Sequence, residues 1–452
     1  LAVRNQFFTP RYVVEFLTDN TLGRIWYEMR KGDTVLKEKC RYLVRGPNEV
    51  FLGTDEKPPA GKDDGTDLSQ EELLKRPVYI EHRPKKDPRD LRILDPACGS
   101  GHFLLYAFDL LEQFYEEAWS DPESPKSDVT GRTLQEDLET LDDLRRETPK
   151  LIVEHNLHGI DIDPRAVQIA ALAIWLRAQK TWKSLDIKAA GRPRIARSNI
   201  VTAEPMPGEE DMRREFTAGL KPRVLGQIVD EVFEKMKLAS EAGSLLKIEE
   251  EIKDAVAAAG KQWWEGTKPE QQLLFPVMDA PRPKQLELRF DVKGITDVRF
   301  WEQAEDRILD ALQEYAERAE NGYATRRRLF AEDAARGFAF IDLCRKRYDV
   351  VLMNPPFGEP AKLSKTLIER SFPRTKNDVY AAFVERSLGL LQQGGRLGAI
   401  TSRTGFFLSS FTKWREEILL KEAKPAVFAD LGYGVMDNAM VEAAAYCLEA
   451  LR

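Results

Sequence analysis

The chain has 452 residues, of which 42% are hydrophobic and 32% charged, and this length allows two or more domains with a large core. No run of about 18 apolar residues is present, so the sequence predicts no membrane helix, and its start lacks the pattern of a signal peptide. The net charge of −7 disfavours a nonspecific DNA-binding protein, because contacts with phosphates need a basic surface.

The cysteines indicate the cellular compartment, and the histidines give no sign of a metal site. The four cysteines are Cys40, Cys98, Cys344 and Cys447. Their spacing indicates neither disulfide pairs nor a metal site, which predicts a protein of the reducing cytoplasm. His155 and His158 lie close together without a partner cluster, so we expect no metal site. Because the first residue is Leu1, we expect a processed start or a piece of a longer protein.

The first predicted element is a helix within residues 4–30. One side of it is apolar and consists of Val13, Val14, Phe16, Leu17 and Leu22. Thr9 is a favourable N-cap and Pro10 suits the first helical position, so Phe8-Thr9-Pro10 is explained sufficiently by a helix start.

A buried strand, a sharp turn and a helix are predicted over residues 91–119. Ile93 and Leu94 supply the strand, and the turn is Asp95-Pro96-Ala97-Cys98-Gly99-Ser100-Gly101. Gly99 and Gly101 let the backbone fold tightly and approach a ligand, and a small adenosine-containing molecule would fit there.

The next strand and its exit are predicted at residues 157–164, and a helix begins at Pro164. An acid at the end of the second strand of a Rossmann-like sheet can accept both ribose hydroxyls. Asp161 and Asp163 compete for that role, and strand alternation points them the same way, so geometry leaves both open.

A third strand with its loop is predicted at residues 195–200, which includes Asn199. Residues 202–340 then interrupt the alternation of strands and helices. Apolar residues recur there at helical spacing, which predicts a mainly helical insertion.

Strands resume with Tyr348 to Met353, which is followed by Asn354-Pro355-Pro356-Phe357. The segment 361–376 is basic and contains Lys362, Lys365, Arg370, Arg374 and Lys376 against Glu369. It is either a solvated loop or a site of phosphate contact. A helix at 377–391 and strands at 398–401, 426–430 and 443–448 complete the prediction.

Two of these motifs resemble those of a known enzyme group. Asp-Pro-Ala-Cys-Gly-Ser-Gly is similar to the S-adenosylmethionine loop of amino-methyltransferases. Asn-Pro-Pro-Phe at a strand end resembles the site of enzymes that methylate the N6 amine of adenine in DNA. The most similar look-alikes are large anti-phage methyltransferases: PglX of BREX, the adenine methyltransferase of DISARM, and type IIG restriction-modification enzymes.

The resemblance implies an α/β fold, namely a Rossmann-like class I methyltransferase sheet with helices on both faces and an added helical insertion. Residues 1–201 then form the first part of the core, 202–340 the insertion, and 341–452 the second, catalytic part. The final strands are expected to form an antiparallel edge.

The resemblance also implies S-adenosyl-L-methionine as cofactor and a set of residues that bind it. Phe8, Thr9 and Pro10 close over its methionine end, and Asp95, Pro96, Ala97, Gly99 and Gly101 form its loop. The family pattern favours Asp161 for the ribose, with Ile162 on the adenine and Asp163 capping the next helix. Many relatives have an Asp that accepts the adenine amine where this chain has Asn199, which is either that acceptor or a turn residue.

Catalysis is expected at Asn354, Pro355, Pro356 and Phe357. The Asn354 side-chain oxygen and the Pro355 carbonyl can each accept one N6 hydrogen, and the two prolines preorganise these acceptors. Phe357 can stack on a base that is flipped out of the duplex. Phe406 or Phe407 offers a second face, although a loop Phe packed on the core is the alternative.

Double-stranded DNA is therefore the expected partner, with other subunits of a defence system or a missing C-terminal target-recognition region, and no membrane. Two rival functions stay open. One is methylation of a protein glutamine, since such enzymes share Asn-Pro-Pro-Tyr. The other is a catalytically silent scaffold that recognises DNA or phage protein.

Overall fold

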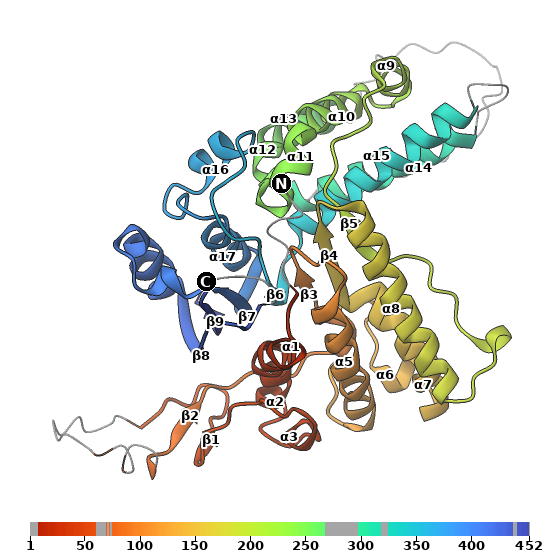
Figure 1. Ribbon diagram of the computed structural model, residues 1–452. Helices are drawn as coiled ribbons and strands as arrows, with labels where there is room; N and C mark the ends of the chain where they lie inside the picture. The colour runs from red at the N-terminus through yellow and green to blue at the C-terminus, as the bar shows by residue number, and fades with distance from the viewer. Residues whose placement is uncertain are drawn as a thin grey trace. The chain divides into compact units, whose positions relative to one another are not determined.

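The computed structural model describes residues 8–59, 69, 72, 75–266, 297–317, 324–436 and 441–451. The described chain forms two compact units. Figure 1 shows the ribbon coloured by residue number. The sheet unit comprises the residues up to Ala203, Ala239–Leu246, and those from Asp342 onward, and the helical unit comprises Glu204–Leu238 and Lys247–Ile341. The helical unit therefore differs from the expected insertion of residues 202–340, because residues 239–246 belong to the sheet unit.

A seven-stranded sheet forms the centre of the sheet unit, in the order β5-β4-β3-β6-β7-β9-β8. Its strands are β3 (Ile93–Asp95), β4 (Leu157–Asp161), β5 (Asn199–Thr202), β6 (Tyr348–Met353), β7 (Leu391–Ser402), β8 (Ala423–Gly432) and β9 (Ala443–Ala450). β9 runs antiparallel to both of its neighbours, β7 and β8, whereas the pairs from β5 to β7 are parallel. The expected α/β sheet with an antiparallel edge is confirmed.

Register brings the two predicted loops to the same edge of this sheet. Leu94 of β3 pairs with Val351 of β6, and Asp95 pairs with Gly159 of β4. Since these strands are parallel, their carboxyl ends lie together, and the segments that follow Asp95, Asp161 and Met353 are neighbours.

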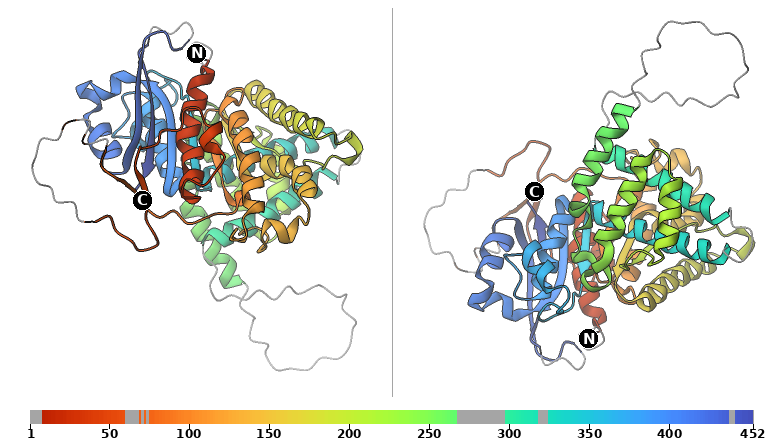
Figure 2. Two further views of the ribbon diagram at one scale, coloured as in Figure 1. Left: turned by 90° about the horizontal axis from the view of Figure 1, so that it is seen from below. Right: turned by 90° about the horizontal axis from the view of Figure 1, so that it is seen from above.

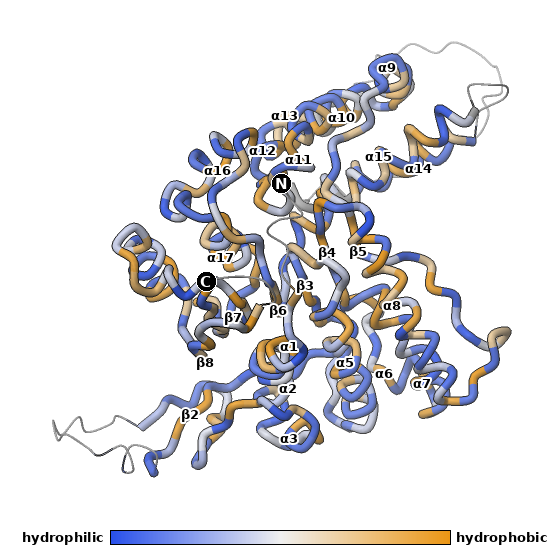
Figure 3. Tube along the Cα trace, viewed as in Figure 1, coloured by the Kyte–Doolittle hydropathy of each residue, from blue (hydrophilic) through white to orange (hydrophobic). Residues whose placement is uncertain are grey.

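Helices cover both faces of the sheet, as expected. The N-terminal helix α1 (Arg11–Thr18) continues through a π-helical turn (Asp19–Gly23) into α2 (Arg24–Met29), and it lies beside β7 and β9 in Figures 1 and 2. The helix α5 (His102–Ser120) packs between α1 and α8 (Pro164–Ser184), while α17 (Val379–Leu390) covers β7 from the other face. Figure 3 shows hydrophobic and hydrophilic residues recurring in turn along α8.

The remaining elements of the sheet unit are short. They are α3 (Leu36–Lys39), the parallel pair β1 (Glu49–Phe51) and β2 (Val78–Ile80), α6 (Leu134–Asp137), α7 (Leu141–Leu151), α11 (Ala239–Ala242) and α16 (Lys365–Ser371). The helical unit contains α9 (Glu210–Gly219), α10 (Arg223–Lys235), α12 (Ile248–Glu251), α13 (Lys253–Gly266), α14 (Asp297–Glu317) and most of α15 (Ala324–Arg345). In the part of the chain that the structure describes, no helix is both long and apolar enough to cross a membrane.

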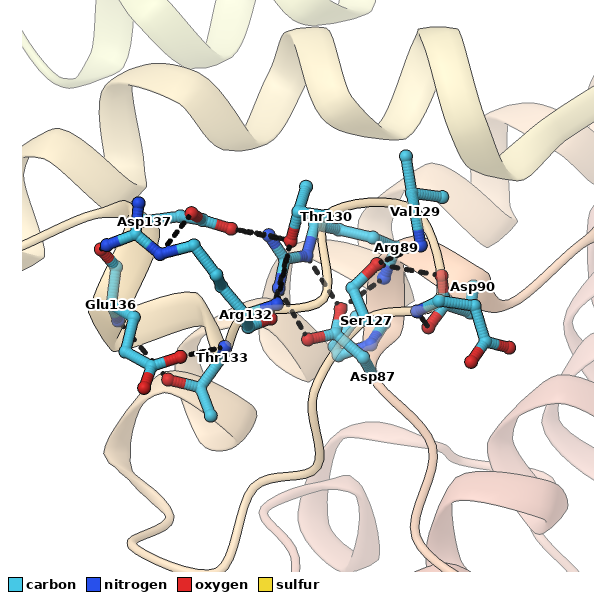
Figure 4. Close-up of polar contacts among 12 residues, drawn as sticks. Asp87, Arg89, Asp90, Ser127, Val129, Thr130, Arg132, Thr133, Glu136 and Asp137 are labelled. Atoms are coloured by element: carbon cyan, nitrogen blue, oxygen red, sulfur yellow. Dashed lines mark hydrogen bonds and ion pairs between the residues drawn. The ribbon is translucent and has the colours of Figure 1, made fainter. Parts of the chain in front are cut away.

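A polar network fixes the segment that enters β3 (Figure 4). The Arg89 guanidinium donates to both carboxylate oxygens of Asp87 and to Asp137, and Ser127 donates to Asp90. Asp87, Arg89 and Asp90 lie just before β3 in the chain, so the network lies at the amino end of that strand. A cavity of about 450 Å³ beside Arg89 is accordingly remote from the edge at which the predicted loops meet.

Candidate functional site

The loop after β3 makes the turn that the sequence predicts. Gly99 has φ +51° and Gly101 has φ +83°, which are left-handed conformations that side chains disfavour. A Cβ atom at Gly101 would lie 3.2 Å from the Ala170 Cβ on α8, so only glycine allows this close approach. Gly101 ends the loop as the N-cap residue of α5.

A cavity of about 700 Å³ opens at the carboxyl edge of the sheet, between this loop and the one that follows β6. Predicted cofactor residues that line it are Phe8, Thr9, Asp95, Pro96, Ala97, Gly99, Asp161 and Ile162. Of the predicted catalytic residues, Asn354, Pro356 and Phe357 line it. Pro355 is buried and does not line the cavity, and Pro10 occupies the N-cap position of α1.

Asp161 and Asp163 have different roles in this geometry. The Gly99 N–H donates to Asp161 Oδ2 at 2.8 Å, and the Asp163 N–H donates to Asp161 Oδ1 at 2.9 Å. Asp163 accepts from the Arg165 N–H, which confirms that it caps α8. The Asp161 carboxylate thus joins the two loops and faces the cavity, while Asp163 is held by the helix it caps.

Two buried carboxyls line the cavity, those of Asp95 and Asp161. Asp95 is 2% exposed, and burial raises the pKa of its carboxyl well above the usual range. Burial also raises the pKa of Asp161, although N–H groups of Asp163 and Gly99 oppose the shift. A cationic ligand would stabilise the ionised form of both groups, so the cavity favours a positively charged molecule.

The loop after β6 presents the Asn354 amide in a defined orientation. Asn354 Nδ2 donates to Thr9 Oγ1 at 2.9 Å, so the nitrogen of the amide faces Thr9, and the side-chain oxygen is the acceptor group of the amide. Asp378, the N-cap of α17, accepts from the Gly358 and Tyr380 N–H groups, and burial raises the pKa of its carboxyl to about 6. The Asn-Pro-Pro-Phe loop is therefore held at both ends.

The expected N-cap role of Thr9 is wrong. The helix α1 begins at Arg11, and the carbonyl of Pro10 accepts from the Val13 and Val14 N–H groups. The Thr9 hydroxyl, which is 7% exposed, is instead the partner of the Asn354 amide. Thr9 thus belongs to the site by a contact that the helix-start pattern conceals.

Two roles were left open for Asn199, and the contact with the adenine amine is wrong, because Asn199 does not line the cavity. The strand β5 begins at Asn199, which pairs with His158 near the amino end of β4. Its amide donates to the Glu154 carbonyl. The carboxyl end of β5, where a ligand contact would arise, lies three residues later, at Thr202.

The residues expected to stack on the base and to contact phosphates differ in where they lie. Phe357 is 8% exposed, lines the cavity and packs edge-on against Tyr380. Phe406 is half-buried and packs against Trp414, Phe428 and Tyr446, whereas Phe407 is 65% exposed. In the basic segment, Arg374 forms ion pairs with Glu385 and Glu422, and this arginine therefore has a structural role.

Sequence reasoning missed one part of the cavity wall. Glu241, Ala242, Gly243 and Leu245 line the cavity, although they lie within the predicted insertion. The only local signal is the Ala-Gly-Ser run at 242–244, which marks a break between helical stretches.

Two family models match the chain. The Eco57I restriction-modification methylase model matches residues 155–433, and the model of the DNA-methyltransferase domain of MmeI matches residues 83–195. The adenine-specific methyltransferase BrxX of Escherichia coli O9:H4 (strain HS) is 25% identical over 434 residues, which are 93% of this chain and 28% of BrxX. The adenine-specific methyltransferase PglX of Lacticaseibacillus casei (strain Zhang) is 24% identical over 91% of this chain and 26% of PglX. The chain thus spans little more than a quarter of these relatives.

Solved structures resemble the chain more weakly. The DrdV–DNA complex has a TM-score of 0.38 at 12% identity and covers 98% of this chain and 26% of that one. A modification subunit of a putative type I restriction enzyme from Vibrio vulnificus YJ016 has a TM-score of 0.35 at 12% identity, over 99% of this chain and 45% of that one.

Proposed function

Because the chain belongs to the Eco57I restriction-modification methylase family, we propose that it transfers a methyl group from S-adenosylmethionine to the N6 amine of a flipped-out adenine in DNA. One observation carries the proposal: the glycine loop after β3 and the Asn-Pro-Pro-Phe loop after β6 line the same cavity, on adjacent parallel strands. A methyl donor bound by the first loop would face an amine bound by the second.

The cavity residues fit the cofactor. Bound S-adenosylmethionine supplies a sulfonium methyl group that is already electrophilic. The buried carboxyls of Asp95 and Asp161 suit its cationic methionine end and its ribose hydroxyls, while Phe8 and Thr9 line the same cavity. Tight packing of Gly101 on Ala170 keeps the loop backbone next to α8, so the loop is preorganised for the ligand.

Asn354 is proposed to prepare the adenine amine. The lone pair of that nitrogen is delocalised into the ring, so two acceptors for its hydrogens favour the more tetrahedral, nucleophilic form. The Asn354 side-chain oxygen is one acceptor, because its Nδ2 is engaged with Thr9, and the Pro355 carbonyl is the other. Fixed acceptors need no reorganisation during the reaction.

The base must leave the duplex to reach these acceptors, and stacking recovers part of the cost. Phe357 in the cavity and the exposed Phe407 after β7 are the proposed stacking residues. Lys362 and Lys365 are proposed to contact phosphates, since they follow the Asn-Pro-Pro-Phe loop directly.

We also propose that the enzyme marks host DNA within an anti-phage system in the cytoplasm. The likeness to BrxX and PglX supports the system that contains PglX over the other candidates, and four buried cysteines that form no disulfide fit a reducing compartment. Other subunits or further sequence are proposed to supply target recognition, and the small share of BrxX and PglX that the chain spans supports this.

Transfer of a tritiated methyl group tests the function. We expect label in DNA that contains adenine and not in the same duplex with N6-methyladenine at the target. Label in a protein glutamine instead of DNA would favour the first rival function. No binding of S-adenosylmethionine in calorimetry would favour a silent scaffold.

Asp161→Asn should weaken the binding of S-adenosylmethionine by about 10- to 100-fold. The amide loses the charge and one of the acceptors for the Gly99 and Asp163 N–H groups, and hydrogen bonds to charged groups contribute about 1.5–3 kcal/mol. Isothermal titration calorimetry measures the change. Asp163→Asn is the matched control, because asparagine also caps helices well and should leave the affinity unchanged.

The affinity for S-adenosylmethionine should fall as the pH is lowered, and the loss should begin above the ordinary carboxyl value of 3.8 because the pKa of Asp161 is raised. Protonated Asp161 has lost the charge that favours a cationic ligand, so binding requires release of a proton. Asp161→Asn should flatten this dependence. An equally steep dependence in the variant would assign it to another group.

Thr9→Val should lower kcat for methyl transfer by about 3- to 10-fold, the equivalent of one neutral hydrogen bond. Valine keeps the shape of threonine but cannot accept from the Asn354 amide, so the acceptor oxygen is no longer held in place. Thr9→Ser should restore kcat. If Thr9→Val changed only the affinity for the cofactor, Thr9 would not position Asn354.

A further inference from the structure

A short segment of the predicted insertion packs against the cofactor cavity. Residues 239–246 belong to the sheet unit, although the chain on either side, up to Leu238 and from Lys247, belongs to the helical unit. They form α11 and a 3-10 turn at Gly243–Leu245. We call residues 239–246 the wall segment.

Three contacts fix the wall segment to the loops of the site. Ser244 Oγ donates to the carbonyl of Pro96 at 3.1 Å, within the loop after β3. Arg386 Nε on α17 donates to the carbonyl of Ser244 at 2.9 Å. Gly243 lies so near Ile162 that an added Cβ would be 3.0 Å from the Ile162 Cγ2 atom. Since Ser244 is fully buried, these bonds are shielded from solvent.

The wall segment therefore bounds the cavity next to Asp161, the carboxylate proposed to bind the ribose. Asp161 ends β4, Ile162 follows it, and Gly243 packs on Ile162. Ala242, Gly243 and Leu245 present small or apolar surface to the cavity at this end. An apolar slot next to a ribose site suits the flat face of a purine.

Among the described residues, few polar groups at this end of the cavity could form a hydrogen bond with the edge of the purine. Asp163 and Arg165 line the cavity but are paired with each other at 2.9 Å, and Asp163 also caps α8. Asn199, the position of the expected acceptor, is bonded to Glu154 and lies outside the cavity. Glu241 supplies a carboxylate from the wall segment itself.

We propose that the wall segment forms the adenine subsite of the cofactor cavity, and that the Glu241 carboxylate accepts a hydrogen from the cofactor's own adenine amine. This rests on the proposed function, since it presumes an adenosyl cofactor. It assigns the specificity for adenine to a residue of the insertion.

Two ligands that differ in one group test the role of Glu241. S-adenosylhomocysteine carries the 6-amine, and its analogue with hydrogen at position 6 does not. The wild-type protein should bind S-adenosylhomocysteine at least about tenfold more tightly, as expected for loss of a hydrogen bond to a charged group. Glu241→Ala should bind both ligands within about two- to threefold of each other, with the loss confined to S-adenosylhomocysteine.

Glu359→Ala is the matched control, because Glu359 also lines the cavity, on the side of the Asn-Pro-Pro-Phe loop. It should keep the wild-type preference for the amine. Full preference in Glu241→Ala would overturn the proposal while leaving the methyltransferase function in place. Failure of the wild-type protein to bind S-adenosylhomocysteine would overturn both.

Two glycine variants test whether the wall segment shapes the subsite. Gly243→Ala places a methyl group against Ile162 at a residue with φ +55°. Gly131→Ala imposes a similar backbone strain at φ +69°, but its Cβ would meet nothing within 4 Å. Gly243→Ala should bind S-adenosylhomocysteine at least about tenfold more weakly than Gly131→Ala, which should match the wild type. Equal affinities would show that the wall segment does not shape the subsite.

Discussion

Asn354→Ala should abolish methyl transfer to DNA, with kcat reduced by at least about 10²–10³-fold, while S-adenosylmethionine still binds. The expected size follows from the loss of one preorganised polar group at the reacting centre. Only the Pro355 carbonyl would remain to accept an N6 hydrogen. The cofactor loop should be undisturbed, because the hydrogen bonds of Gly99 and Asp161 do not involve Asn354. Steady-state transfer of a tritiated methyl group and calorimetry measure the two properties.

Two further variants separate chemistry from loop shape. Asn354→Asp keeps an acceptor oxygen that the Thr9 hydroxyl can approach, so it should retain part of the activity. Asn48→Ala alters an exposed asparagine whose amide donates to the Lys75 carbonyl, and it should behave as the wild type. Wild-type turnover by Asn354→Ala would remove this residue from catalysis and leave the Asn-Pro-Pro-Phe loop as a rigid turn.

The sheet could be predicted from the sequence because its signals are local. Apolar runs end at Asp95-Pro96 and at Asn354-Pro355, where proline stops the strand and glycine allows the turn. Parallel neighbours then share one edge, so the meeting of the two loops follows from topology. The antiparallel position of β9 was expected from the resemblance and not from its residues.

Contacts between distant residues could not be predicted in the same way. Thr9 has the local pattern of an N-cap, but its partner Asn354 lies 345 residues away. Asn199 was expected at a strand end, yet the pairing of β5 with β4 makes it the strand's first residue, and this pairing depends on tertiary packing. The wall segment carries no periodic signal that distinguishes it from the helical stretches on either side.

A buried ion network attaches the N-terminal helix to the sheet. Glu28 on α2, whose side chain is 6% exposed, forms ion pairs with Arg24 at 2.8 Å, Arg83 at 3.0 Å and Arg396 of β7 at 2.8 Å. Arg396 also reaches Glu449 of β9. Burial opposes ionisation of Glu28, but the charges of Arg396, Arg83 and Arg24 outweigh it, so the pKa of Glu28 is lowered.

Glu28→Ala should destabilise the protein by about 3–5 kcal/mol, because it leaves three arginines with no shared carboxylate in a region shielded from water. Differential scanning calorimetry should show a lower Tm, whereas Glu123→Ala, which removes an 82% exposed partner of Lys85, should cost less than about 1 kcal/mol. The stability that ionised Glu28 contributes is present above the ordinary value of 4.5 and is lost as the pH falls through its lowered pKa. The difference between wild type and Glu28→Gln should therefore shrink at acid pH. An unchanged Tm for Glu28→Ala would mean that apolar packing alone holds the helix that follows Thr9 on the sheet.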